Sequence, residues 1–181
     1  MKSKKFYQIG ISGHRDLLKE EEDEHISILK DYLLNIQKKH PNQEILVLTP
    51  LADGADRRIA KAALQLNFPY KAILPMPKYL YIKDFSHSSK DEFEELLKKA
   101  IEIQTIKFYA ANTRELVESS PLHRAFQYRE AGKMIVDTAD EMIFMSDGIK
   151  NNKIGGTEDI AEYAQKHGKI IRTIRCKRKC A

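Results

Sequence analysis

Short apolar segments alternate along the chain with longer stretches in which apolar residues recur every three or four positions. The apolar segments predict six strands, at 5–11, 44–49, 70–75, 105–110, 141–146 and 169–174. The longer stretches have the spacing of one helix face, and they predict helices that include 26–36, 59–66, 93–101, 128–135 and 160–167. The chain therefore alternates strand and helix throughout.

Repeated strand–helix–strand units are typical of an α/β domain with a mainly parallel sheet. The segments 45–48 (ILVL) and 142–145 (MIFM) are apolar at every position, which suits strands that are covered by helices on both faces. We therefore expect a three-layer α/β/α sandwich, Rossmann-like, with about six strands. No linker divides the chain, so residues 1–174 are expected to form a single domain, followed by a basic tail at 175–181.

The composition fits this fold, since 42% of the 181 residues are hydrophobic and 31% are charged. No apolar run approaches the roughly 20 residues of a membrane span, and the first residues lack the features of a secretory signal. We expect a cytoplasmic protein that does not bind membranes and that forms homo-oligomers, the commonest arrangement.

The net charge of +5 is concentrated at one end of the sequence. Five basic residues and no acid lie between 171 and 181, so the rest of the chain is neutral by count, with 26 basic and 26 acidic residues. This tail makes nucleic acid a partner to consider. It also contains both cysteines, Cys176 and Cys180, and without a secretory context we expect them to be exposed, reduced thiols.

Parallel α/β sheets bind ligands beyond the carboxyl ends of their strands. After the first strand come Gly13, His14 and Arg15, in which the glycine allows a close backbone approach and the arginine offers a planar fork for an anion, although a plain turn is an equal alternative. After the second strand, Gly54 and Asp56 open an Ala-rich helix, where Asp56 is either functional or a helix cap.

Aromatic residues follow the third strand, including Tyr81 and Phe85. They could stack on a base, but a small apolar cluster under the loop is the favoured interpretation. In the helix that includes 128–135, Tyr128 is expected to be packed, whereas Arg124 and Arg129 either reach the ligand crevice or are solvated.

The strongest local signal follows the fifth strand. Asp147 and Gly148 end that strand, and Gly155, Gly156 and Thr157 open the next helix. Backbone amides and a hydroxyl at a helix N-terminus favour a bound phosphate, while the structural alternative is a helix with Thr157 as its N-cap.

Taken in order, five motifs resemble the Rossmann-like SLOG superfamily, which contains the DNA-processing protein DprA and the LONELY GUY phosphoribohydrolases. They are GHRD at 13–16, PLADGADR at 50–57, LPMP at 74–77, DTADEMIFMSDG at 137–148 and GGTEDIAEYA at 155–164. The similarity runs from about residue 7 to residue 174. It implies a nucleotide-derived ligand with its phosphate on the GGT helix start, near Gly13, Arg15, Gly54 and Asp56.

One position departs from the LONELY GUY pattern PGGxGTxxE. The catalytic glutamate of those enzymes corresponds here to Ile160, and Asp159 is rotated from that place by about 100° on a helix. We therefore expect a nucleotide or ADP-ribose-like sensor with no further cofactor and no metal. The alternatives are a nucleoside-monophosphate N-glycosidase, with Asp147 or Asp159 as its catalytic carboxylate, and DprA-like DNA binding through the tail.

Overall fold

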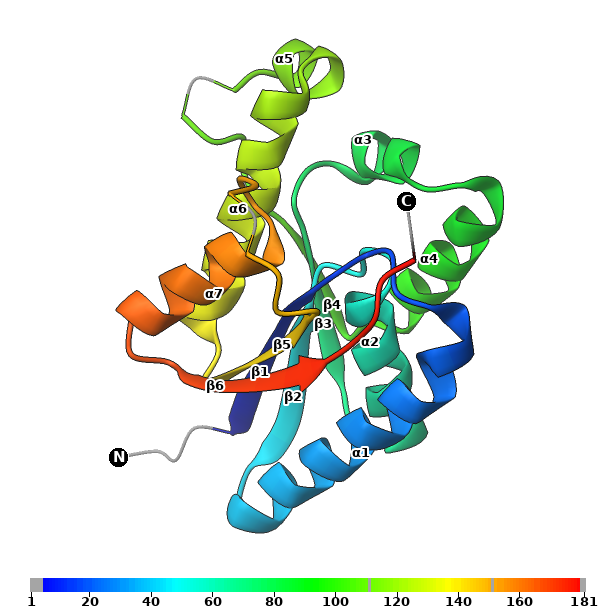
Figure 1. Cartoon of the computed structure of the whole chain (residues 1–181), viewed down its shortest axis with the longest axis vertical. Helices are drawn as coiled ribbons and strands as arrows, with labels where there is room; N and C mark the ends of the chain where they lie inside the picture. Colours follow the sequence, from blue (N-terminus) through cyan, green and yellow to red (C-terminus); the bar gives the residue numbers. More distant parts are fainter. Residues whose placement is uncertain (1–4, 111, 151, 180–181) are drawn as a thin grey trace.

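The sheet of the computed structural model has six parallel strands in the order β4-β3-β2-β1-β5-β6. The structure describes residues 5–110, 112–150 and 152–179. The strands are β1 (Phe6–Gly13), β2 (Glu44–Thr49), β3 (Tyr70–Leu74), β4 (Glu102–Thr105), β5 (Glu141–Ser146) and β6 (Ile170–Arg175). The expected Rossmann-like sandwich is confirmed (Figure 1).

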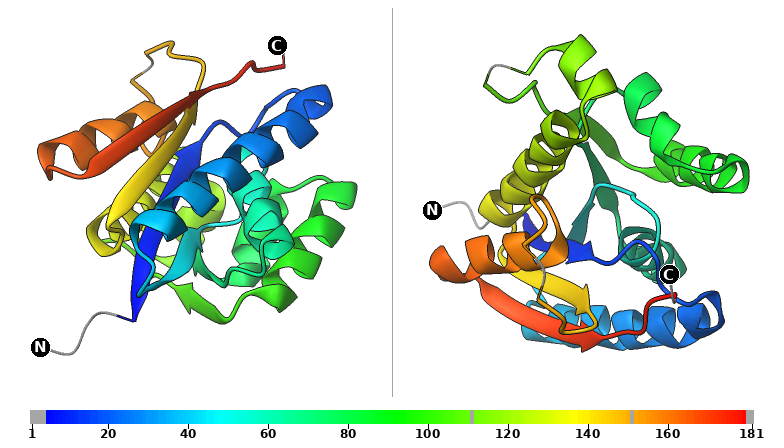
Figure 2. Two further views of the ribbon diagram at one scale, coloured as in Figure 1. Left: turned by 90° about the horizontal axis from the view of Figure 1, so that it is seen from below. Right: turned by 45° about the horizontal axis from the view of Figure 1, so that its top comes forward.

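Helices cover both faces of this sheet, as Figure 2 shows. One face carries α1 (Glu22–Lys39), α2 (Ala55–Gln65) and α4 (His87–Lys99), and the other carries α6 (Pro121–Thr138) and α7 (Thr157–Lys166). The connections also contain the short helices α3 (Lys78–Tyr81), α5 (Arg114–Ser119), η1 (Lys19–Glu21) and η2 (Ile82–Asp84).

Alternate residues of the central strands supply the two apolar layers between sheet and helices. In β2, Ile45 and Val47 pack into the layer with α1 and α2, while Leu46 and Leu48 pack into the layer with α6 and α7. Because both faces are buried, the strand is apolar at successive positions, which explains why the sequence shows a continuous run.

The chain changes direction between β1 and β5. From β1 it winds through β2 and β3 to β4, and it then returns to place β5 and β6 on the other side of β1. The helices after β1 and β5 consequently leave toward opposite faces, and such a switch point opens a crevice at the carboxyl ends of the two strands.

The predicted strand at 105–110 is wrong, because β4 is Glu102–Thr105. Ile106 still donates its N–H to Leu74 O at 3.0 Å, but the chain then leaves the sheet. The apolar residues beyond it pack as a loop: Tyr109 stacks on Phe126 and its backbone N–H bonds to the Gln127 side chain. β4 itself is a mostly exposed edge strand, so it carries no apolar run.

The basic end of the chain folds back onto the loop after β1. Residues 176–179, which we call the C-terminal strap, form a bridge between Arg178 and Leu17. Arg178 binds the Asp16 carboxylate through Nε at 2.9 Å and Nη2 at 2.8 Å, and Lys177 pairs with Glu21 at 3.3 Å. Two of the three basic side chains of the strap, Lys177 and Arg178, are thus paired with acids of the domain.

Cys176, the first residue of the strap, is buried, so the expectation of an exposed thiol is wrong for this residue. It packs into the apolar layer that also contains Leu17 and Ile174. Burial raises the pKa of its thiol to about 11. Cys180 lies outside the described residues.

Candidate functional site

A cavity of about 490 Å³ lies at the switch point between β1 and β5. Its walls come from the end of β1 and the loop behind it, the loop before α2, the helix α6, and the segment 153–160 that opens α7. Arg178 of the C-terminal strap completes one side. The crevice expected from the topology is therefore present and is a well-defined cavity.

Two glycines hold the loop after β1 against the start of α2. A Cβ on Gly13 would lie 2.9 Å from Met145 O, and one on Gly54 would lie 2.7 Å from Arg15 O. Gly54 also has a φ of +74°, a conformation that other residues adopt only with strain. The Ala55 N–H then reaches His14 O at 3.2 Å, which fixes His14 and Arg15 at the cavity wall.

The start of α7 is anchored to α6. Gly155 has a φ of +68°, and a Cβ there would lie 2.6 Å from Ala125 O. Its N–H donates to Asp159 Oδ2 at 2.8 Å, and the same carboxylate pairs with Arg129 at 3.0 Å. Gly156, not Thr157, is the N-cap residue, and Thr157 is the first residue of the helix.

Residues 155–158 line the cavity, so the N-terminus of α7 faces it. The first N–H groups of an α-helix have no acceptor within the helix and carry its partial positive charge. Those of Thr157 and Glu158 are in this position, which makes this wall suitable for an anion.

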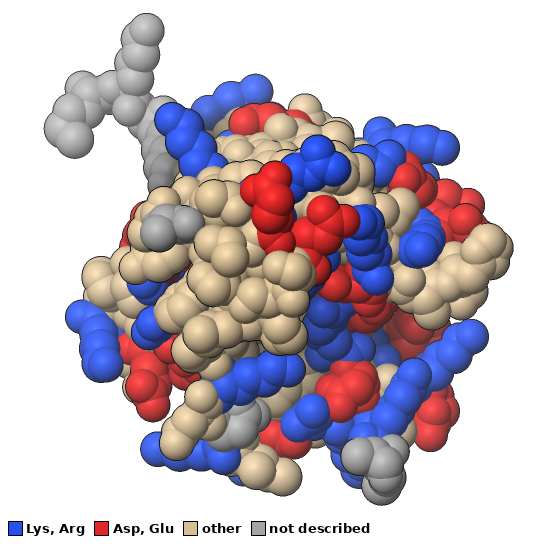
Figure 3. All heavy atoms as spheres, turned by 90° about the horizontal axis from the view of Figure 1, so that it is seen from above, with Lys and Arg blue, Asp and Glu red and all other residues tan. Residues whose placement is uncertain are grey.

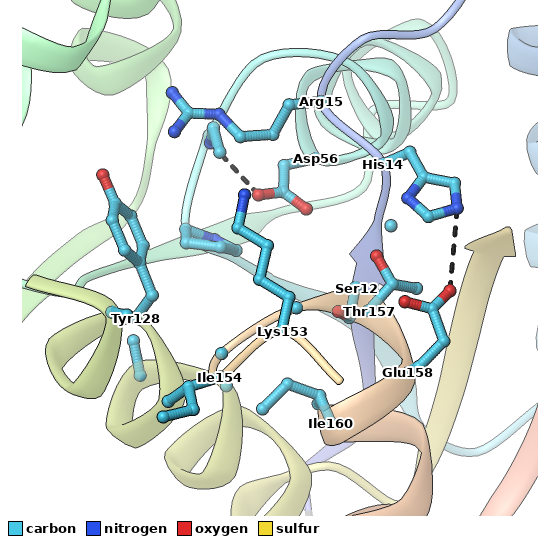
Figure 4. A pocket seen from close by; sticks show the side chains of 18 of the residues that line it. Ser12, His14, Arg15, Asp56, Tyr128, Lys153, Ile154, Thr157, Glu158 and Ile160 are labelled. Atoms are coloured by element: carbon cyan, nitrogen blue, oxygen red, sulfur yellow. Dashed lines mark hydrogen bonds and ion pairs between the residues drawn. The ribbon is translucent and has the colours of Figure 1, made fainter. Parts of the chain in front are cut away.

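Basic and aromatic side chains lie opposite the α7 start, and Figure 4 shows Arg15, Lys153 and Tyr128 around the same space. The Arg15 guanidinium lies 5.8 Å from the centre of the Tyr128 ring and 3.7 Å from Asp53. Arg15 is 39% exposed, so it is accessible to a ligand.

Arg124 also lines the cavity, but its guanidinium is engaged in holding the fold. It binds Asp84 at 2.9 Å, Leu80 O at 2.6 Å and Val117 O at 3.1 Å. The Tyr128 hydroxyl donates to Asp84 as well. Arg124 thus ties α6 to the segment after β3, and we assign it a structural role.

Asp56 is a buried carboxyl group at the cavity wall. Burial raises its pKa to about 8, although the Ala52 N–H that it accepts at 3.1 Å and the nearby Arg15 and Arg57 oppose the shift. At neutral pH the group therefore carries a proton, and it can donate a hydrogen bond as well as accept one.

Tyr81 adds a second polar group to the same wall. Its hydroxyl is buried and has no hydrogen-bond partner among the described residues. Phe85 and Phe93 pack against its ring, which confirms the aromatic cluster expected after the third strand. This packing accounts for the burial of the ring, but it gives the hydroxyl no hydrogen-bond partner.

His14 joins the loop after β1 to the ends of β5 and α7. Its Nε2 lies 3.0 Å from Asp147 Oδ1 and 3.7 Å from Glu158 Oε1. Burial acts to raise the pKa of Asp147, but the Ile149 N–H and the His14 ring outweigh it and the pKa lies below its usual value. These three side chains form the one group among the described residues with metal-ligand geometry.

Seven of the residues predicted from the sequence line the cavity, and four do not. Those that line it are Gly13, His14, Arg15, Asp56, Gly155, Gly156 and Thr157. Gly54, Gly148, Asp147 and Asp159 are not among the lining residues. Of the two predicted catalytic carboxylates, Asp159 accepts a hydrogen bond from the Gly155 N–H, and Asp147 contacts the lining residues His14 and Arg178.

Glu158, one of the carboxylates that the sequence places closest to the site, lines the cavity. Several other lining residues are not among those predicted from the sequence, including Ser12, Lys153 and Arg178. Ser12 lies one residue before the motif at 13–16, and Lys153 lies two residues before the motif at 155–164. Arg178 lies far from every motif in the sequence, and a basic tail by itself indicates solvent exposure, not a place in a cavity wall.

Within the described ranges, none of the helices has the length and apolar character needed to cross a bilayer. No protein-family model matches the chain, and no curated protein matches it either.

The parallel sheet with a cavity at its switch point defines a Rossmann-like α/β domain. Among solved structures the chain is similar to DprA from Streptococcus pneumoniae (15% identity, TM-score 0.61, covering 93% of this chain and 50% of that one). It is also similar to DprA from Helicobacter pylori, a single-stranded DNA-binding protein (14% identity, TM-score 0.55, covering 92% of this chain and 64% of that one). A third similar structure is TM1055, a structural genomics target (13% identity, TM-score 0.53, covering 91% of this chain and 71% of that one).

The chain thus spans about half to two thirds of the DprA chains it matches. The similarity extends over more than nine tenths of this chain, and it shows that the chain shares the Rossmann-like α/β fold of these proteins.

Proposed function

We propose that the chain binds a nucleotide or nucleotide-derived molecule, such as an ADP-ribose-like ligand, in the cavity between β1 and β5. The observation that carries the proposal is that one cavity joins the N-terminus of α7 to Arg15 and Lys153. A volume of about 490 Å³ lies within the usual range of small-molecule sites.

The phosphate is assigned to the α7 end of the cavity. There the backbone N–H groups of Thr157 and Glu158 meet it. Lys153 begins in the segment just before the helix, and its side chain extends across the cavity toward Asp56. Gly155 is required for this geometry because a side chain would collide with α6.

The sugar and base are assigned to the opposite wall. The protonated carboxyl of Asp56 and the unpartnered Tyr81 hydroxyl are groups that suit sugar hydroxyls, because each can donate and accept a hydrogen bond. The ring of Tyr128 on α6 offers contact area for a base.

Binding without cleavage is favoured by the surroundings of Ile160. This residue stands where the LONELY GUY glutamate would be, and it is 2% exposed and packed beneath Gly132. Asp159 is committed to Gly155 and Arg129. The two carboxylates proposed for glycosidic cleavage therefore do not border the cavity.

The charge distribution favours a small ligand over nucleic acid. The basic residues Lys177 and Arg178 pair with Glu21 and Asp16, so the strap is not a free basic arm. On the face shown in Figure 3, acidic and basic side chains are interspersed instead of forming a continuous basic surface. A nucleic-acid backbone requires such a surface.

Thermal unfolding in the presence of ligands tests the proposal. At 100 times its dissociation constant, a ligand adds about 2.7 kcal/mol to stability, which for a chain of this size raises Tm by about 5 to 11 °C. We expect such a shift with AMP, NAD, a cyclic nucleotide or ADP-ribose, and a smaller one with adenosine, which lacks the phosphate.

Variants locate the binding. Arg15→Ala and Lys153→Ala should each weaken binding at least tenfold, whereas Arg114→Ala and Lys166→Ala change exposed residues outside the cavity and should not. A Tm that no phosphorylated nucleotide raises would refute the proposal. Release of free base from AMP by the protein would instead establish the glycosidase alternative.

A further inference from the structure

Three side chains that can coordinate metals meet at the edge of the cavity. One ligand atom each of His14, Asp147 and Glu158 lies within 4.8 Å of the other two. They come from the ends of β1 and β5 and from the first turn of α7, and His14 and Glu158 line the cavity (Figure 4). Phosphate binding by backbone amides requires none of them.

The spacing of the three groups matches a coordination shell. Two ligands that are each about 2.0–2.1 Å from a tetrahedral ion are about 3.3 Å apart. His14 Nε2 lies 3.0 Å from Asp147 Oδ1 and 3.7 Å from Glu158 Oε1, which brackets that value. Asp147 and Glu158 lie within 4.8 Å of each other, so side-chain rotations could bring all three groups onto one ion.

A second observation concerns Glu158. Its Oε1 accepts a hydrogen bond from Ser146 Oγ at 3.2 Å, but its Oε2 is buried and has no partner among the described residues. A buried carboxylate oxygen without a partner is costly, by roughly 1–3 kcal/mol or more for a charged group. A cation bound by both oxygens of the Glu158 carboxylate would satisfy it.

The surrounding hydrogen bonds hold these ligands in place. The backbone N–H of His14 donates to Met145 O at 3.1 Å, and the backbone N–H of Ile149 donates to Asp147 Oδ1 at 2.9 Å. Arg178 approaches the other oxygen of Asp147, Oδ2, at 3.7 Å. Such outer contacts are typical of metal sites, where they orient the coordinating groups.

We propose that His14, Asp147 and Glu158 bind one divalent transition-metal ion of the Zn²⁺ or Mn²⁺ class. An imidazole nitrogen with two carboxylates favours these ions over Ca²⁺, which prefers a shell of oxygens only. Three protein ligands leave a coordination position open, and it would face the cavity. Contact of the ion with a ligand phosphate is a further step that rests on the proposed function.

Calorimetric titration of the EDTA-treated full chain with Zn²⁺ and with Mn²⁺, in the absence of any nucleotide, tests the site. We expect one ion per chain, with affinity reduced at least tenfold by His14→Ala and by Glu158→Gln. Glu162→Gln on the same helix and the exposed His167→Ala should leave it unchanged. Absence of stoichiometric binding, or equal affinity in all variants, would overturn the proposal.

Anomalous diffraction from crystals of the unaltered protein soaked in Zn²⁺ decides the matter if a variant does not fold. A peak within about 2.3 Å of His14 Nε2 supports the site, and a peak elsewhere or none overturns it. Both experiments omit nucleotide, so a failure to bind nucleotides and a failure to bind metal are observed separately.

Discussion

The buried carboxyl of Asp56 should make the stability of the protein fall as the pH rises. Its pKa is about 8 in the folded chain, against an ordinary value of 3.8 for an aspartate. Because the folded state holds this proton more strongly, its contribution to stability is fully present below pH 4. It is lost as the pH rises through the folded pKa, at about 1.4 kcal/mol per pH unit.

At pH 7 this loss amounts to roughly 4 kcal/mol, a large share of the 5–15 kcal/mol that stabilises an ordinary domain. Asp56→Asn removes the titration and keeps an oxygen that can accept the Ala52 N–H. The variant should therefore gain stability over the parent protein progressively between pH 5 and pH 8, even though the substitution lies in the candidate site.

Urea unfolding followed by circular dichroism at pH 5, 6, 7 and 8 measures the effect. The difference in unfolding free energy between Asp56→Asn and the parent should grow by about 1.4 kcal/mol per pH unit up to pH 7. Asp31→Asn changes an exposed carboxylate on α1, and its unfolding free energy should differ from that of the parent by the same amount at every pH. A constant difference for Asp56→Asn as well would refute the reasoning.

Three further substitutions or reactions probe the structure around the site. Gly54→Ala should lower the unfolding free energy by roughly 2–4 kcal/mol in thermal melts, because its φ is +74° and His14 and Arg15 crowd the new Cβ. Gly168→Ala is the matched control, since its φ is also positive but no atom lies within 4 Å, and an equal loss there would contradict the steric argument. Gln127→Ala removes hydrogen bonds to Pro75 O and from the Tyr109 N–H, so chemical denaturation should show a loss of about 3 kcal/mol; an unchanged midpoint would show that these groups find other partners. In a Cys180→Ser background, Cys176 should react with a disulfide reagent at pH 8 about 100-fold more slowly in the folded than in the urea-unfolded chain, because its pKa is about 11, and equal rates would show that the thiol is exposed.

Most of the fold could be predicted from the sequence because its central strands are buried on both faces. The strands β2 and β5 begin and end where the apolar runs do. The edge strand β4 could not be predicted in this way, since its side chains are largely exposed and the neighbouring apolar residues belong to a packed loop.

The candidate site could be predicted only as far as it is built from local motifs. Glycines at strand ends and at the α7 start mark places where the backbone must approach closely, and a short window of sequence shows them. The pairing of His14 with Asp147 joins positions 133 residues apart, and only the sheet order brings them together. The roles of Asp56 and Tyr81 depend on burial, which no local pattern specifies.

The C-terminal strap has a consequence for how the site is made. Asp16 and Arg178 are separated by 162 positions in the chain, yet both line the cavity. During synthesis the sheet can begin to assemble from its first strands, but this wall cannot close until residue 178 has left the ribosome. A nascent chain therefore closes this wall of the cavity only after β1 to β6 have all been synthesised.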